Sequence, residues 1–343
     1  MDIFEGLLWS YEGDGVFYWG QVVGGILYVG SEDDHLYALD ASTGELVWRY
    51  RTDGDVLPSV IADGVLYAGS EDGHVYALDA ATGELVQTYA VGDGMPGLPT
   101  VRDGVIYTGS EDGRVYAMDA SNGEILWSYE TDVDPALDGT TILSEVIDQV
   151  AIARAGGKYY GLDTSTGDLL WLYEISGPLW PGSLPTLQDG VLYLGLSSHV
   201  EALDALTGAN LWSYETGAPA RPQFSTPAVE GGVVHVALGD GHLHAVEAGT
   251  GKLIWRSGVP ESREIVFLDS PQVVGEVVYI YSSDMRLHAF AASTGQLLWR
   301  SVELKAPVIY AYLLAVVDGV IYIGAFDYPE NGYLYAVEVP FAN

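Results

Sequence analysis

GVLYAGSEDGHVYALDAATGELV, at residues 64–86, is followed by a near copy of itself, GVIYTGSEDGRVYAMDASNGEIL, at residues 104–126. Within each copy, runs such as 65–70 and 74–79 alternate apolar and polar residues with the period of two that is typical of β-strands. Turn-forming pairs separate these runs, Asp72-Gly73 and Thr82-Gly83. Each copy therefore predicts a meander of short antiparallel strands.

The same unit recurs along the whole chain. Its second strand carries one equivalent position in each copy, at spacings of 39, 40, 45, 41, 42, 44 and 43 residues: Tyr28, Tyr67, Tyr107, Ile152, Tyr193, His235, Tyr279 and Tyr322. Four strands fit into each copy. We expect the innermost to resemble Leu57 to Asp63 and the outermost to resemble Gly44 to Trp48.

Eight such repeats predict an all-β fold in one domain that covers residues 1–343. A four-stranded sheet of about 40 residues cannot bury both of its faces alone, so neighbouring sheets must stack. Radial stacking closes the set without long exposed edges. We therefore expect an eight-bladed β-propeller of four-stranded antiparallel blades.

The two ends of the sequence predict how this propeller closes. The last repeat, at about 311–339, has no outer strand of its own, whereas EGLLWSYE at residues 5–12 matches GEILWSYE at residues 123–130. The N-terminal strand, at about 6–12, should thus complete the last blade. The outer strands carry tryptophans that we expect to dock between blades: Trp9, Trp48, Trp127, Trp171, Trp212, Trp255 and Trp299.

The string AxDxxTGxxxW starts at Ala38 and ends at Trp48, and it recurs from Ala202 to Trp212. It resembles the tryptophan-docking motif of the PQQ-type (quinoprotein-like or BamB-like) propeller repeat family. That resemblance covers essentially the whole chain. It implies that the indole packs between neighbouring blades, and that the aspartate and threonine side chains tie the hairpin before it.

Several blades depart from this motif. Gln87 replaces the tryptophan in the second blade, Glu247 replaces the aspartate in the sixth, and Phe290 replaces it in the seventh. The fourth blade, at about 131–171, is the most eroded. Such departures indicate either drift or a functional surface, and drift is the favoured interpretation.

Charge and composition exclude several classes of function. The chain has 13 basic and 48 acidic residues, a formal charge of −35, so we expect no binding to nucleic acid. It contains no cysteine, and we find neither a transmembrane run nor a signal peptide in it. The acidic, lysine-poor composition is typical of halophilic proteins and of many exported propellers. Since the repeat family is often exported, we expect a cell-envelope or extracellular location.

The loops between blades and the Asp-Gly hairpins should open on one face, which we call the variable face. Its inter-blade loops hold aromatic, basic or polar residues that the repeat does not require, beginning with Phe17 and Tyr18. Loops on a rigid scaffold commonly carry binding function. An alternative is that the aromatics only plug the axial channel. The candidate ligand-binding or partner-binding residues are Trp19, Trp180, Arg221, Gln223, Phe224, Arg263, Phe267, Tyr310 and Tyr312.

Catalytic and metal sites find little support in the sequence. The SEDG loops cluster carboxylates, but they lack the ligand order of a calcium loop and fit tight hairpin turns instead. The histidines are dispersed, and His35, His74, His199 and His242 follow the same hairpin in different blades. We predict no catalytic residues, no metal and no cofactor. PQQ with calcium is the alternative that the family resemblance implies, but family enzymes commonly carry adjacent cysteines at the cofactor.

We therefore expect a non-enzymatic, monomeric binding or scaffolding propeller that holds a protein segment or a small ligand on its variable face. The alternative is a PQQ-, quinone- or glycan-binding protein, or a quinoprotein dehydrogenase-like enzyme, with a pocket at the mouth of the axial channel. A repeat-amplified scaffold without a ligand, natural or designed from a consensus, is a third possibility.

Overall fold

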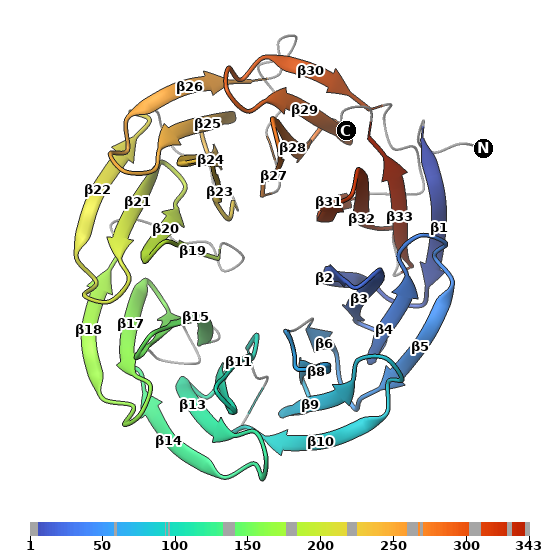
Figure 1. The fold of residues 1–343 in the computed structure, drawn as a ribbon, viewed down its shortest axis with the longest axis vertical. Helices are drawn as coiled ribbons and strands as arrows, with labels where there is room; N and C mark the ends of the chain where they lie inside the picture. Colours follow the sequence, from blue (N-terminus) through green and yellow to red (C-terminus); the bar gives the residue numbers. More distant parts are fainter. Residues whose placement is uncertain are drawn as a thin grey trace. The chain divides into compact units, whose positions relative to one another are not determined.

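A computed structural model describes residues 6–57, 60–92, 94, 97–132, 141–175, 184–217, 225–258, 267, 270–301, 310–327 and 331–339, with the backbone alone described for Trp19, Leu143, Ser144 and Tyr310. All regular elements in these ranges are β-strands, and they form eight antiparallel sheets. The chain is thus an all-β, eight-bladed β-propeller, as predicted (Figure 1). No helix in the described ranges is long and apolar enough to cross a membrane.

The blades fall into two compact units, which are described separately. The N-terminal unit consists of Gly13–Ser176 and Ala205–Gly208. Its four sheets contain the following strands in chain order: β2 (Phe17–Val23), β3 (Ile26–Ser31), β4 (His35–Asp40) and β5 (Leu46–Arg51); β6 (Val56–Leu57), β7 (Ile61–Ala62), β8 (Val65–Ser70), β9 (His74–Asp79) and β10 (Leu85–Ala90); β11 (Thr100–Arg102), β12 (Val105–Gly109), β13 (Arg114–Asp119) and β14 (Ile125–Glu130); β15 (Ile142–Ile147), β16 (Val150–Ala155), β17 (Lys158–Asp163) and β18 (Leu169–Glu174).

The C-terminal unit consists of Met1–Glu12, Gly177–Asp204 and Ala209–Asn343. Its sheets contain β19 (Thr186–Gln188), β20 (Val191–Gly195), β21 (His199–Asp204) and β22 (Asn210–Glu215); β23 (Ala228–Glu230), β24 (Val233–Leu238), β25 (His242–Glu247) and β26 (Leu253–Ser257); β27 (Gln272–Val274), β28 (Val277–Ser282), β29 (Arg286–Ala291) and β30 (Leu297–Arg300); and β31 (Tyr310–Val317), β32 (Val320–Phe326), β33 (Gly332–Glu338) and β1 (Leu7–Gly13).

The position of β1 confirms the predicted closure. The strand order of the last sheet is β1-β33-β32-β31, so the N-terminal strand forms the outer edge of the final blade (Figure 1). The amide of Glu338 donates to the carbonyl of Gly6 at 2.9 Å. Trp9 is buried, with its ring centroid 6.0 Å from that of Tyr322 on β32. Sequence positions from the two ends of the chain therefore share one sheet.

The turns explain where the strands end. Asp63 and Gly64 both have positive φ, at 51° and 79°, as a two-residue type I′ hairpin requires. The innermost strand expected at Leu57 to Asp63 is instead split into β6 and β7, which both pair with β8. Pro58 lies between them in the sequence, and a proline has no amide hydrogen to donate to a ladder.

The core lies between adjacent sheets. One buried cluster, for example, joins Tyr28 and Leu36 of the first blade to Leu66 and Leu78 of the second. Trp48, on the outer strand of the first blade, belongs to the same buried cluster. The Nε1 of Trp48 donates to the carbonyl of Ala80 at 3.0 Å, and the hydroxyl of Tyr28 donates to the same oxygen at 3.0 Å. One carbonyl of the second blade thus accepts two aromatic donors from the first.

The hairpin before the tryptophan is held as the family resemblance implied. Asp40 Oδ1 accepts the amide of Thr43 at 2.9 Å, and Thr43 Oγ1 accepts the amide of Glu45 at 3.2 Å. The indole of Trp48 then lies against the corresponding turn of the next blade. A Cβ on Gly83 would stand 2.6 Å from that ring, so this turn needs glycine both for its φ of +71° and for space.

One departure from the motif gains a physical explanation, and another was assigned to the wrong residue. Where Gln87 replaces the tryptophan, the buried Tyr89 takes over and donates to the carbonyl of Ala120 at 2.6 Å. The assignment of Phe290 to the aspartate position was wrong by one residue. Ala291 occupies that position, because its carbonyl accepts the amide of Gly295 and it pairs with Val277, while Phe290 is fully buried.

Candidate functional site

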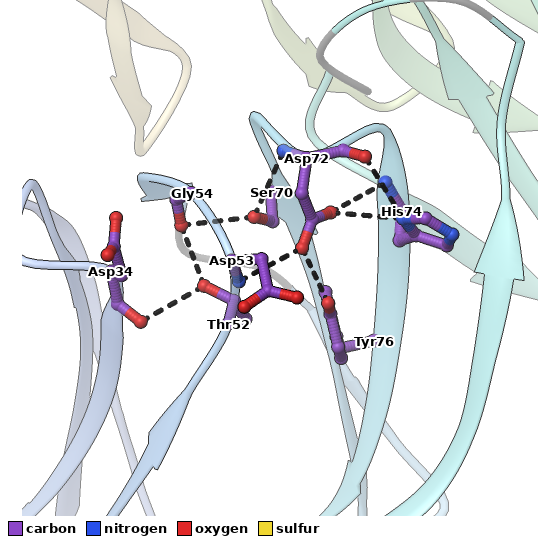
Figure 2. Close-up of polar contacts among 8 residues, drawn as sticks. All are labelled: Asp34, Thr52, Asp53, Gly54, Ser70, Asp72, His74 and Tyr76. Carbon is purple, nitrogen blue, oxygen red and sulfur yellow. Dashed lines mark hydrogen bonds and ion pairs between the residues drawn. The ribbon is translucent and has the colours of Figure 1, made fainter.

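The SEDG-type hairpins of the N-terminal unit are built around an aspartate whose oxygens are used inside the hairpin. Asp72, in the turn between β8 and β9, accepts the hydroxyl of Tyr76 at 2.5 Å and the amide of His74 at 3.0 Å. Figure 2 shows both contacts, together with the amide of Asp53, which donates to Asp72 Oδ2 at 3.1 Å. This aspartate has a structural role, in agreement with the hairpin interpretation of the loop.

The segment that connects the first two blades is pinned to these hairpins. Thr52 Oγ1 donates to the carbonyl of Asp34 at 3.0 Å and to that of Gly54 at 2.7 Å. Ser70 Oγ also donates to the carbonyl of Gly54, at 3.0 Å (Figure 2). Inter-blade segment and hairpins therefore lie on one face of this unit, as expected. These hydrogen bonds hold the segment around Thr52 against the two hairpins.

Carboxylates from successive blades converge on this face. Glu32, Glu71 and Glu111 occupy the same hairpin position in the first three blades, and all three are exposed. Partial burial, followed by the charges of Asp55, Glu111, Glu32 and Asp34, raises the pKa of Glu71. We call Glu32, Glu71, Glu111 and Asp55 the acidic face.

Tyr18 joins the acidic face from the innermost strand. Its hydroxyl donates to Asp55 Oδ2 at 3.1 Å and lies 3.3 Å from Glu32 Oε1. Burial and the two carboxylates raise the pKa of Tyr18 well above its usual value, so it stays a neutral donor. Burial also raises the pKa of Asp55. In Tyr18, Asp55 and Glu71 burial is the largest cause of the rise in pKa, and neighbouring carboxylates add to it.

The aspartate and aromatic pairing recurs in other blades, which identifies it as architecture. The pairs are Asp33 with Tyr37, Asp112 with Tyr116, Asp132 with Tyr160, Asp240 with His244, Asp284 with His288 and Asp327 with Tyr333. His35, His74 and His242 contact the aspartates of their own hairpins. The described residues contain no group of three or more His, Asp or Glu side chains arranged to hold a metal ion.

The predicted binding residues are only partly visible. Trp180, Arg221, Gln223, Phe224 and Arg263 lie outside the described residues. Trp19 and Tyr310 lie in β2 and β31, with only their backbone described. Neither Phe17 nor Tyr18 lies in a loop as expected, because both belong to β2.

Phe267 and Tyr312 are the two predicted binding residues whose side chains are described. Phe267 is 1% exposed and packs edge-on against His288 and Phe290, at centroid distances of 6.1 and 5.8 Å. The ring of Tyr312 lies over Gly324 on the paired strand, where a Cβ would stand 2.6 Å from it. Both side chains thus have packing roles, and their role in binding remains a prediction.

The sequence interpretation missed Asp55 and Glu71 as members of the site. The repeated SEDG string was the available signal, but it was interpreted only as turn chemistry. The turn explains Asp72 and the glycine after it, whereas nothing in turn geometry requires Glu71. The glutamate of the SEDG string recurs in three blades although the turn does not require it, and this repetition could have identified the acidic face.

Comparison with known proteins is consistent with this architecture. The family described as outer membrane protein assembly factor BamB matches residues 6–86, 57–180 and 196–338. No significant match is found among curated proteins.

Three solved structures share the fold. BamB from Moraxella catarrhalis is 17% identical, with a TM-score of 0.74 over 97% of this chain and 99% of that one. The computationally designed Ika8 protein is 17% identical, with a TM-score of 0.78 over 98% and 100%. A europium-containing methanol dehydrogenase is 16% identical, with a TM-score of 0.72 over 97% and 93%. At these identities the likeness establishes the fold alone.

Proposed function

The chain belongs to the family of the outer membrane protein assembly factor BamB, and on that premise we propose that it is a scaffold that holds a segment of a protein partner on its variable face. This function requires neither catalysis nor a cofactor. We also propose a location in the cell envelope or outside the cell, for which the family description is the support.

The observation that carries the proposal is the acidic face of the N-terminal unit. Three exposed glutamates repeat at one position of successive hairpins, and the pKa of Glu71 is raised partly by its acidic neighbours. A cationic group placed among these carboxylates would relieve their mutual repulsion. The partner segment we propose is therefore basic.

The hydrogen bonds around the acidic face support binding as well. Thr52, Ser70 and Asp72 hold the inter-blade segment and the hairpin in place through hydrogen bonds. A surface that is already ordered loses little conformational entropy when a partner binds. In this proposal the basic segment is the flexible partner. The negative formal charge of −35 on this chain would attract it from a distance.

A labelled peptide of alternating lysine and threonine residues tests the proposal by fluorescence anisotropy. The variant Glu32→Gln/Glu71→Gln/Glu111→Gln should weaken binding roughly 3- to 150-fold, because exposed charge pairs contribute about 0.2–1 kcal/mol each. Affinity should fall as salt rises from about 50 to about 500 mM, since screening shortens the range of these charges.

The same blades offer a matched control. Glu45, Glu84 and Glu124 follow the Thr-Gly or Asn-Gly turns of these three blades, and their replacement by glutamine changes the net charge by the same amount. If the control triple variant weakens the peptide as much as the hairpin triple variant does, binding follows overall charge and the acidic face is not the site.

Cofactor binding is the competing function and is tested on the same protein. Addition of PQQ with calcium should leave the melting temperature unchanged if the chain is a scaffold. A rise in melting temperature that depends on both additives would favour a quinoprotein-like function instead.

A further inference from the structure

The hairpin of the fifth blade differs from the other hairpins of the C-terminal unit and from the SEDG hairpins of the first three blades. It reads Leu196-Ser197-Ser198-His199 between β20 and β21 and is one residue shorter than SEDGH at 70–74. The amide of Leu196 donates to the carbonyl of His199 at 2.9 Å, which closes a two-residue turn of Ser197 and Ser198. No acidic residue is left in the turn.

The acidic residue of this hairpin, Glu201, lies in strand β21 instead of in the turn. Glu201 stands where the hairpins of the first three blades have Tyr37, Tyr76 and Tyr116, two residues after the hairpin's His or Arg position. It is 3% exposed, and its Oε1 lies 3.3 Å from Nε2 of His199. On the other side of the imidazole, Nδ1 lies 3.2 Å from the hydroxyl of Ser198. Serine, histidine and glutamate are thus in line.

The exposure of the three side chains increases from the acid to the serine, as a nucleophile that substrate must reach requires. Glu201 is the most deeply buried, His199 is 8% exposed, and Ser198 is partly exposed at the tip of the turn. Glu201 keeps the imidazole proton on Nε2, so the lone pair of Nδ1 is available to accept the proton of Ser198. The acid orients the base, and the base contacts the nucleophile.

A second group in this turn has spare hydrogen-bonding capacity. Ser197 is 5% exposed, and its hydroxyl has no hydrogen-bond partner among the described residues. The seventh blade provides the contrast. There Ser282, Asp284 and His288 also contact one another, but Ser282 and His288 are fully buried, so no substrate reaches that serine.

From this geometry we infer that Ser198 is an activated nucleophile that accepts an acyl group from an activated carboxylic ester. The Ser198 Oγ bonds to the carbonyl carbon and its proton passes to Nδ1 of His199. The bond from that carbon to the leaving oxygen then breaks as Nδ1 gives the proton to that oxygen, which departs as the alcohol and leaves the imidazole neutral. Water then attacks the acyl-serine by the same route, releases the acid and restores the hydroxyl. This reactivity lies in the C-terminal unit and is independent of the proposed scaffold function.

The dispersal of the histidines over blades about 40 residues apart does not indicate this site. Ser198, His199 and Glu201 come from one hairpin, and the two-residue turn between β20 and β21 places Ser198 directly before the strand. His199 and Glu201 lie in β21 two residues apart, so their side chains point to the same side of the strand.

The full-length protein is tested with a fluorophosphonate probe, with mass spectrometry to locate the label, and with p-nitrophenyl acetate for turnover. We expect the label on Ser198 and turnover of the ester. Ser198→Ala should abolish the label. Glu201→Gln should lower the labelling rate at least about tenfold, because positioned general-base catalysis contributes about 10²–10⁴-fold.

Ser282→Ala is the matched control and should leave labelling and hydrolysis unchanged. Circular dichroism identifies any variant that fails to fold, and the labelled position in the unmodified protein gives a result that needs no variant. Absence of label at Ser198, or a labelling rate that Glu201→Gln leaves intact, would overturn the inference.

Discussion

Gly83 provides a sharp test of how the docked tryptophans hold the blades together. A Cβ at this position would lie 2.6 Å from the Cδ2 atom of Trp48, and ordinary contact begins at 3.4 Å, so the indole would have to move by roughly 0.8 Å. Gly83 also has a φ of +71°, which disfavours alanine by itself. Gly83→Ala therefore combines a backbone penalty with displacement of a buried ring.

Two further glycines separate these contributions. Gly64 has a φ of +79° and nothing within 4 Å of the point that an added methyl group would occupy, so Gly64→Ala measures the backbone penalty alone. Gly123, in the third blade, is the equivalent of Gly83 and has a φ of +77°. It faces Gln87 instead of a tryptophan, and a Cβ added there would lie 3.3 Å from its nearest neighbours. We expect losses of unfolding free energy of about 1 kcal/mol for Gly64→Ala. We expect only slightly more for Gly123→Ala, and about 2–4 kcal/mol for Gly83→Ala.

Urea unfolding monitored by far-UV circular dichroism gives these differences, and tryptophan fluorescence shows whether both probes report one transition. In a Trp48→Phe background the excess penalty of Gly83→Ala should shrink, because the smaller ring leaves room. Equal losses for Gly83→Ala and Gly64→Ala would refute the reasoning, since the indole would then place no constraint on the turn.

Three other expectations follow from described contacts. Tyr89→Phe should lower the free energy of unfolding by about 1–3 kcal/mol, measured by urea unfolding, because it leaves the partly buried carbonyl of Ala120 without this donor. Trp9→Ala should lower it by about 3–5 kcal/mol, because it empties the packing of the closing strand, and a loss below about 1 kcal/mol would contradict that role. Burial lowers the pKa of His235 and of His288 below the ordinary value of 6.5, so the unfolded chain takes up protons first as pH falls. The contribution of these two residues to stability should be complete above about pH 6.5 and decline below it, which urea midpoints between about pH 8 and about pH 5 would show.

Much of the fold follows from the sequence because each blade obeys local rules. The type I′ turn at Asp63 and Gly64, the period of two in the strands and the Trp48 motif are all legible within about 40 residues. The misplacement of Phe290 was an error of register within a regular copy, because Ala289, Ala291, Thr294, Gly295 and Trp299 have the spacing of the motif. The pairing of Ala291 with Val277 corrects it.

The candidate sites were harder to predict. Glu71 acquires its significance from Asp55, Glu111 and Glu32, which belong to different hairpins or segments of the chain. Likewise, Tyr89 becomes a substitute for a missing indole only because Ala120 presents its carbonyl from the next blade. Neither relation is visible in the spacing of residues along one strand.

The sequence by itself determined the repeat, the number of blades, the turns and the closing strand, because these depend on contacts between residues near in sequence or on copies of one pattern. Only the tertiary structure decided which carboxylates of different blades lie close together and which aromatic residues are packed rather than exposed. The physical reason is that electrostatic and hydrogen-bonding interactions act over a few ångströms, and such distances between blades are set by packing.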